Sequence, residues 1–264
     1  MIDLKGHSAL VTGSTKGVGK AIAEAFAAAG ANVVIHGRSL SRDARETMER
    51  CRLHGVNASF AAADLSISTE PAVGDLFRLA LAAQPDIDIL VNNAGQYYDV
   101  PFEEMTGERF DKTMQLNVTT PYFLTQRFAR HWIERGVAGR VLFIGSINGR
   151  LAEPVSTAYD ISKGAVEMMV RTLAVTLAPR NIRVNGLAPG VVLTPQTAWI
   201  TDTQPLKADW VRLHTPNGQI PPAEVCGPGA VYLVSDAAWH VHGHMLMVDG
   251  GMSAWQYPEA RKEG

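Results

Sequence analysis

The stretch TGSTKGVGK, Thr12 to Lys20, follows a short apolar run and opens a segment with helical periodicity. Its glycines have the spacing GxxxGxG. Small residues at a strand-to-helix turn let the backbone and the helix N-terminus approach a pyrophosphate, where free N–H groups and the helix dipole favour negative charge. A Walker A loop is excluded, because Ser14 replaces its first glycine and Ala21 replaces its hydroxyl residue. The remaining interpretations are a phosphate-binding turn and a plain connecting turn.

Short apolar runs alternate with helical segments on both sides of this turn. Seven runs are nearly continuously apolar, as strands buried on both faces must be, and they begin at Ser8, Asn32, Ala58, Ile87, Arg140, Ile182 and His244. Repeated strand–helix–strand order implies right-handed crossovers. We therefore expect an α/β fold with one domain over residues 1–264, a doubly wound parallel sheet of about seven strands. Residues 191–222 are rich in proline with little periodicity, which predicts a substrate lid.

Composition narrows the class of protein further. The 264 residues are 46% hydrophobic, which is ordinary for a globular core. A formal net charge of -2 gives no reason to expect nucleic acid or an anionic membrane as partner. The first residues lack the apolar region of a signal peptide, and no uncharged apolar run is long enough to span a bilayer. Cys51 and Cys226 have no zinc-site spacing, which favours free thiols. We therefore expect a cytoplasmic protein.

Further motifs follow the glycine turn in a fixed order. They are NNAG at Asn92 to Gly95, LNVTTP around Asn117, IGSING around Ser146, YDISK at Tyr159 to Lys163 and VDGG at Val248 to Gly251. This order and spacing resemble the short-chain dehydrogenase/reductase family over the whole chain. The resemblance implies a Rossmann fold, an enzyme that interconverts a secondary alcohol and a ketone, and a homotetramer.

Tyr159 and Lys163 stand at i and i+4 of a helix expected over Ser156 to Ala178, so their side chains share a face. A phenol has a reference pKa of about 10, and a neighbouring ammonium favours the phenolate. The resemblance implies that Tyr159 exchanges a proton with the substrate oxygen, and that Ser146 hydrogen-bonds the same oxygen. It also implies that Lys163 binds the nicotinamide ribose, and that Asn117 interrupts a long helix and holds a water of the proton relay.

The second apolar run leads into Gly37 and Arg38, where NAD-preferring members of the family carry an acid. Without that acid a 2′-phosphate is not repelled, and Arg38 and Lys16 can bind it by charge-assisted hydrogen bonds. We therefore expect NADP(H), with NAD(H) as the less favoured cofactor. The resemblance implies a cofactor site of Gly13, Ser14, Thr15, Lys16, Gly17, Val18, Gly19, Arg38, Ser39, Asp64, Leu65, Asn92, Ala94, Gly95, Tyr159, Lys163, Pro189, Gly190, Val192 and Thr194.

Substrate contacts in this family come from residues after NNAG, from residues after the catalytic serine and from the lid. The candidates here are Gln96, Tyr97, Ser146, Asn148, Glu153, Tyr159 and Trp199. This polar and aromatic set favours a small hydroxylated or cyclic ketone or alcohol over a long alkyl chain. Two alternatives stay open. One is reduction of a 3-oxoacyl thioester, and the other is an NADP-binding protein without catalytic activity.

Two features near the end of the chain have competing interpretations. His240, His242 and His244 have period two, which would place three imidazoles on one strand face as a metal site. No carboxylate or cysteine lies close in sequence, and the segment resembles the family's turn into its last strand, so we expect no metal. In the tail, Trp255 and Tyr257 are candidates for a subunit interface, with a frayed terminus as the alternative.

Overall fold

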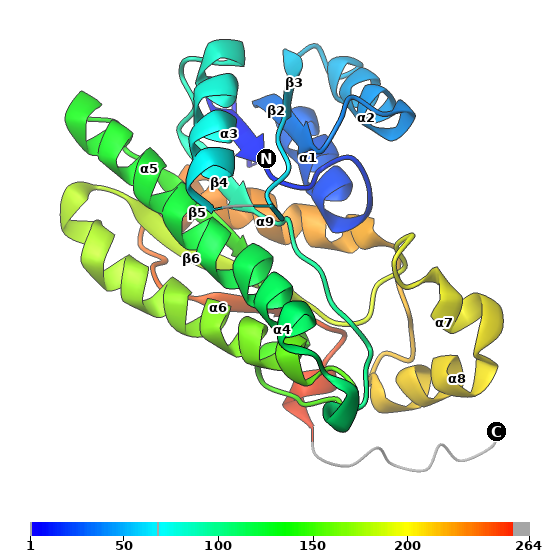
Figure 1. The fold of residues 1–264 in the computed structure, drawn as a ribbon. Helices are drawn as coiled ribbons and strands as arrows, with labels where there is room; N and C mark the ends of the chain where they lie inside the picture. Colours follow the sequence, from blue (N-terminus) through cyan, green and yellow to red (C-terminus); the bar gives the residue numbers. More distant parts are fainter. Residues whose placement is uncertain (1, 68, 256–264) are drawn as a thin grey trace.

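The seven apolar runs form one parallel sheet in the computed structural model, which describes residues 2–67 and 69–255 (Figure 1). The strand order is β3-β2-β1-β4-β5-β6-β7, and every pairing is parallel. The strands are β1 Ser8–Val11, β2 Asn32–Gly37, β3 Ala58–Ala62, β4 Ile89–Asn92, β5 Arg140–Ile144, β6 Arg183–Pro189 and β7 Met245–Val248. The predicted doubly wound sheet is confirmed.

Helices cover both faces of the sheet, because successive strand residues point to opposite sides. They are α1 Gly17–Ala28, α2 Arg42–Arg52, α3 Thr69–Ala83, α4 Gly107–Met114, α5 Thr120–Arg135, α6 Thr157–Leu177, α7 Ala198–Thr203, α8 Pro205–His214 and α9 Cys226–Val234. Leu10, Val34 and Leu90 are neighbours in register and pack under α3, α5 and α6. Val11 and Ile35 point the other way and pack under α1, α2 and α9.

One long helix is interrupted where the family resemblance predicts it. Between α4 and α5 the residues Gln115–Thr119 form a π-helical turn. Asn117 lies in this turn and is buried. The extra residue of a π turn shifts the side chains that follow it around the helix axis, and such turns occur frequently at functional sites.

The stretch 191–222 is more regular than its sequence predicts. It contains α7 and α8, and Leu193 forms an isolated bridge with Pro222. Ile200, Ala208 and Val211 are buried. The weak periodicity of the sequence has a local reason, because each helix is too short to show a clear period and Pro205 begins the second helix.

The three histidines near the C-terminus do not lie on a strand. His240 to His244 form the turn before β7, whose first residue is Met245. The described residues contain no group of three or more His, Cys, Asp or Glu side chains that could hold a metal ion. No helix in the described part of the chain is long and apolar enough to cross a membrane. The two cysteines are free, as predicted, and both are buried. Tyr257 lies outside the described residues.

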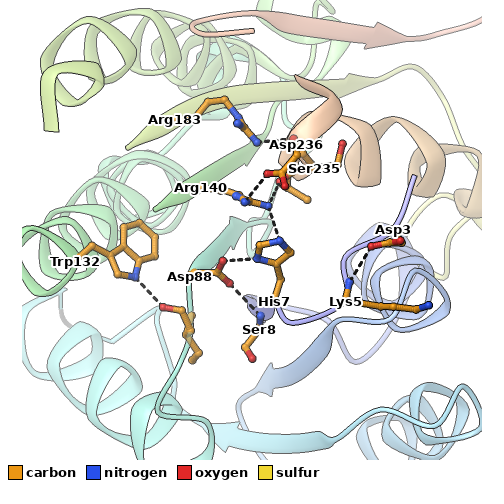
Figure 2. Close-up of polar contacts among 12 residues, drawn as sticks. Asp3, Lys5, His7, Ser8, Asp88, Trp132, Arg140, Arg183, Ser235 and Asp236 are labelled. Atoms are coloured by element: carbon orange, nitrogen blue, oxygen red, sulfur yellow. Dashed lines mark hydrogen bonds and ion pairs between the residues drawn. The ribbon is translucent and has the colours of Figure 1, made fainter. Parts of the chain in front are cut away.

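A polar network joins the strands at their amino-terminal edge (Figure 2). The Asp88 carboxylate accepts hydrogen bonds from the Ser8 N–H and from His7 Nδ1. Arg140 donates to His7 Nε2 at 3.1 Å, to the Val234 carbonyl at 2.9 Å and to Asp236 at 2.7 Å. The arginine therefore ties β5 to the segments that precede β1 and follow α9.

Beside this network, the Trp132 indole donates a hydrogen bond to the Ile87 carbonyl at 2.7 Å (Figure 2). Trp132 is fully buried and packs against Phe128, with ring centroids 5.4 Å apart. It therefore joins α5 to the residues just before β4 through both a hydrogen bond and apolar contact.

Trp132→Phe should lower the free energy of unfolding by about 2 kcal/mol, because it leaves a cavity and a buried carbonyl without its donor. Trp239→Phe is the matched control, since the Trp239 side chain is 70% exposed, and it should change the value by less than about 0.5 kcal/mol. Denaturant unfolding measures both. Equal effects of the two replacements would contradict this account of the Trp132 contacts.

Candidate active site

A cleft of about 570 Å³ lies at the carboxyl ends of the strands. It opens between β1 and β4, where the order of the strands reverses, the place at which open α/β sheets bind ligands. On the far side the cleft is bounded by α7 and α8, which lie beside the connection from β4 to α4 (Figure 1). All of the expected substrate residues line this cleft.

Thr12 and Asn93 hold the two strands together at the opening. The Thr12 hydroxyl donates to the Val91 carbonyl at 3.2 Å and accepts from the N–H groups of Asn93 and Ala94 at 2.9 and 3.0 Å. The Asn93 amide donates to the carbonyls of Thr12 and Gly13 at 2.8 and 3.1 Å. The glycine turn is thereby fixed to the segment that follows β4.

The glycine turn has the shape that an anion requires. Gly13 and Gly17 have φ of 63° and 60°, which L side chains rarely adopt. A Cβ on Gly19 would lie 2.4 Å from the Asn93 amide nitrogen and 2.5 Å from the Gly13 carbonyl oxygen. The first turn of α1 has neither a side-chain cap nor an acidic residue. Its N–H groups and the helix dipole therefore suit a phosphate group.

His36 supports this turn from β2. Its Nδ1 accepts from the Gly13 N–H at 2.9 Å, and its Nε2–H donates to the Ala63 carbonyl at 3.2 Å. The imidazole is almost completely buried, and burial lowers the pKa of His36 to about 4. The neutral imidazole is therefore the form that the turn requires, since a second proton would sit on the nitrogen that accepts from Gly13.

Two cations line the same end of the cleft. Lys16 precedes α1, and Arg38 follows β2 with an exposed side chain. A Cβ on Gly37 would lie 2.7 Å from the Thr15 side chain, so an acid at position 37 would have to displace Thr15. Asp64 also lines this end, and hydrogen bonds from Ser66 hold the pKa of its carboxyl below the usual range.

The side chains expected to perform the chemistry meet at the end of the cleft opposite to Lys16 and Arg38. Ser146, after β5, and Tyr159 and Lys163, on α6, all line the cleft. The Lys163 ammonium donates to the Ile144 carbonyl at 2.8 Å and lies 5.4 Å from the centre of the Tyr159 ring. Asn148 fixes the serine, because its N–H donates to the Ser146 hydroxyl at 3.1 Å.

The electrostatics of this pair differ from the sequence prediction. Burial raises the pKa of Tyr159 to about 12, and the hydrogen bond with Ser146 opposes the shift. Burial also lowers the pKa of Lys163 to about 8. An effect of the Lys163 charge is not seen in the protein alone, where burial is the largest cause of the Tyr159 pKa shift and Lys163 is not among the charges that act on the phenol.

Asn117 does not line the cleft but connects the elements that form it. Its side-chain oxygen accepts from the Gln96 N–H at 2.9 Å, and its amide donates to the Gln96 carbonyl at 2.8 Å and to the Ser162 hydroxyl at 2.9 Å. Ser162 in turn donates to the Tyr159 carbonyl at 2.7 Å. The π-helical turn therefore joins the loop after β4 to the helix that carries Tyr159.

Residues 191–222, the expected lid, contact the loop after β4. Tyr97 donates from its hydroxyl to the Gln196 carbonyl at 3.2 Å, and the Trp199 indole donates to that hydroxyl at 3.4 Å. The ring centroids of Tyr97 and Tyr159 are 5.7 Å apart. The Lys207 ammonium lies 4.6 Å from the centre of the Trp199 ring. Aromatic rings thus lie next to Tyr159.

Most of the predicted cofactor residues line the cleft, but Ser14, Ser39 and Asn92 do not. Ser14 is buried, and its hydroxyl donates to the Val11 carbonyl at 2.6 Å. Asn92 is also buried and donates to the Thr125 hydroxyl at 3.0 Å, while Ser39 is exposed outside the cleft. The Ser14 and Asn92 side chains therefore turn into the core and away from the cleft, since a motif does not show which of its members point inward, whereas a cofactor contact from Ser39 stays a prediction.

The sequence interpretation missed several residues that line the cleft, among them His36, Asp99 and Lys207, whose side chains are ionisable. His36 gave no signal, because a histidine in an apolar run looks like any strand residue. Asp99 follows the NNAG motif closely, and this position was an available signal. Lys207 was not distinguished within the segment 191–222, because the break between α7 and α8 leaves no helical spacing that relates it to Trp199.

The chain is similar to known proteins over nearly all of its length. Residues 13–253 match the model of a family described as enoyl-(acyl carrier protein) reductase. Glucose 1-dehydrogenase 2 of Bacillus subtilis is 35% identical over 255 residues, 96% of this chain and 97% of that relative. 3beta-hydroxysteroid dehydrogenase 1 of Eggerthella lenta is 36% identical over 253 residues, 96% of each chain.

A solved structure extends the similarity to three dimensions. A gluconate 5-dehydrogenase from Burkholderia cenocepacia, in complex with NADP and tartrate, matches with a TM-score of 0.86 and 32% identity. The match covers 96% of this chain and 98% of that chain.

The His36 contacts predict an acid sensitivity of the fold. The folded pKa of about 4 lies below the reference value of 6.5, so the unfolded chain binds the proton more readily. The free energy of unfolding should therefore fall as the pH drops from 6.5 to 4, by up to about 1.4 kcal/mol per pH unit. Denaturant unfolding across this range measures the loss.

His36→Gln should remove this part of the pH dependence. His54→Gln is the matched control, because His54 is exposed, and it should keep the wild-type slope. If the unfolding free energy of His36→Gln fell with pH as steeply as that of the wild type, groups other than His36 would cause the acid sensitivity.

Proposed function

The chain belongs to the short-chain dehydrogenase/reductase family, and we propose that it interconverts a secondary alcohol and a ketone on a small polar substrate with NADP(H). The observation that carries the proposal is one cleft that joins the glycine turn to Ser146, Tyr159 and Lys163. The nicotinamide cofactor, when bound, supplies or accepts the hydride. The protein therefore has to orient the cofactor and the substrate and to transfer one proton to or from the substrate oxygen.

Tyr159 is the residue that we propose for the proton. In reduction its hydroxyl donates the proton to the carbonyl oxygen, and in oxidation the phenolate accepts it from the alcohol. Ser146 lies beside it and interacts with its hydroxyl, so the serine orients the same substrate oxygen. A pKa of about 12 keeps the phenol protonated, which suits its role as the acid in reduction. Lys163, with a pKa of about 8, is the proposed ligand of the cofactor ribose.

The two cations at the adenosine end support NADP(H) over NAD(H). Lys16 and Arg38 line the cleft, and no acid stands at Gly37 to repel a 2′-phosphate. The structure of the related gluconate 5-dehydrogenase contains NADP. The free N–H groups at the start of α1 suit the pyrophosphate.

The two alternatives have less support. A 3-oxoacyl thioester needs an apolar channel for its chain, whereas Asp99, Glu153 and Lys207 bring charge to the lid side of the cleft. A protein that only binds the nucleotide would not need the Tyr159 phenol and Lys163 ammonium to meet in the same cleft.

We further propose association into a homotetramer through α5 and α6. These helices expose apolar side chains at Tyr122, Ile161, Met168 and Val175, of which Val175 is 80% exposed. A row of this kind favours burial against another subunit. The Trp255 indole donates to the His214 carbonyl of the same chain at 3.0 Å, and its place at a subunit interface stays a prediction.

Fluorescence titration tests the choice of cofactor. The wild-type protein should bind NADPH at least tenfold more tightly than NADH, or about 1.4 kcal/mol. Arg38→Ala should remove most of this preference by weakening NADPH alone, because it deletes the phosphate contact. Arg42→Ala is the matched control, since Arg42 is exposed and lies outside the cleft. Equal binding of the two nucleotides by the wild type would mean that Arg38 faces only solvent.

Tyr159→Phe tests the proton role. It should lower kcat by about 10²-fold or more, because the substrate oxygen loses its acid, while NADPH affinity stays near that of the wild type. Tyr98→Phe is the matched control, because Tyr98 does not line the cleft, and it should keep the wild-type kcat. NADPH absorbance reports turnover, and fluorescence reports binding. Unchanged turnover in Tyr159→Phe would remove the catalytic assignment.

A further inference from the structure

The substrate side of the cleft has an unequal charge distribution. Asp99 and Glu153 line it with two carboxylates, whereas Lys207 contributes one ammonium. The other cations of the cleft lie elsewhere. Lys16 and Arg38 belong to the adenosine end, and Lys163 is buried beside Tyr159. The lid side therefore carries a net negative charge next to the reacting atoms.

Glu153 is held near the tyrosines of the site. Its N–H donates to the Asp160 carboxylate at 2.8 Å, and Asp160 also accepts from the Asn148 amide at 2.8 Å. The charge of Glu153 helps to raise the pKa of both Tyr97 and Tyr159. The Glu153 carboxylate is therefore close enough to act on any charged group that binds beside Tyr159.

Asp99 is fixed on the opposite loop. Its carboxylate accepts from the Ser156 hydroxyl at 2.8 Å. The two loops are also joined by a backbone hydrogen bond from the Val100 N–H to the Val155 carbonyl at 2.7 Å. The loop after β4, which carries Asp99, is thus hydrogen-bonded to the loop before α6, which carries Glu153. A substrate in the cleft would lie near both carboxylates.

Lys207 does not neutralise this pair. Its ammonium lies over the Trp199 ring, and within residues 2–67 and 69–255 it forms no ion pair with Asp99 or Glu153. Attraction to Lys207 lowers the pKa of Glu153, but burial raises it more. The lysine therefore offsets part of the negative charge.

The remaining lining suits a compound with many hydroxyl groups. Carboxylates accept hydrogen bonds from hydroxyls, and the Gln96 amide nitrogen is a buried donor without a partner among the described residues. Trp199 and Trp210 also line the cleft. Lys207 lies over one face of Trp199 and His214 stacks on one face of Trp210, so at most one apolar face of each ring can meet the C–H face of a sugar ring. Acceptors, a donor and aromatic rings therefore meet in one place.

We propose, resting on the function proposed above, that the substrate is a neutral polyhydroxylated compound, a sugar or polyol, and that Glu153 selects against substrates that carry a carboxylate. A hydroxyl can donate to Glu153, whereas the carboxylate of a sugar acid has no proton to donate and is repelled. Specificity thus comes from a favourable contact with one class and a repulsive contact with the other.

The test compares matched neutral and acidic compounds of the same length. D-Glucitol is paired with D-gluconate and D-glucose with D-glucuronate, each with NADP⁺, and kcat/KM is measured for every compound. The wild type should prefer the neutral member of a pair by tenfold or more. Glu153→Gln should reduce this preference, and Glu153→Arg should shift it at least tenfold further toward the acid, without changing NADPH affinity.

Glu103→Gln is the matched control, because Glu103 is exposed outside the cleft, and it should keep the wild-type ratio. A wild-type preference for the acids, or the same ratio in Glu153→Arg, would overturn the inference. Turnover of acyl thioesters or steroids but of neither sugar class would also overturn it and leave the redox function standing. A protein that oxidises or reduces none of these compounds would overturn the proposed function itself.

Discussion

The Thr12 hydroxyl is the contact on which the site depends. It bonds to the carbonyl of Val91 and to the N–H groups of the two residues that follow β4, so it fixes the point where the strand order reverses. From there the contacts continue through Gln96 to Asn117, and through Ser162 to the backbone of Tyr159. A continuous series of hydrogen bonds and short backbone segments therefore connects Tyr159, the proposed proton donor, to the glycine turn proposed to bind the cofactor.

Much of the fold follows from sequence, because its causes are local. Apolar runs such as NVVIHG predict buried strands whatever surrounds them, and all seven expected strands are present. The lid helices could not be predicted in the same way. α7 has six residues, and its burial at Ile200 depends on segments distant in sequence.

The site was less predictable than the fold for a related reason. Motifs give the identity of residues but not the direction in which a side chain points, so Ser14 and Asn92 were expected in the cleft although both turn into the core. His36 was missed because its role arises from contacts with Gly13 and Ala63, far away in sequence. The Tyr159 pKa also depends on how much protein surrounds the hydroxyl, and spacing along a helix does not show this.

The expected lid and the residues proposed for proton transfer lie on different elements of the fold. α7 and α8 contribute Trp199, Lys207 and Trp210 to the cleft, whereas Ser146 follows β5, and Tyr159 and Lys163 lie on α6. Under the proposed function, the first group would face the part of a substrate that differs between compounds, and the second would face the carbon and oxygen that react. Mutations in one short segment can therefore give a descendant of this protein a new substrate while its chemistry is inherited unchanged.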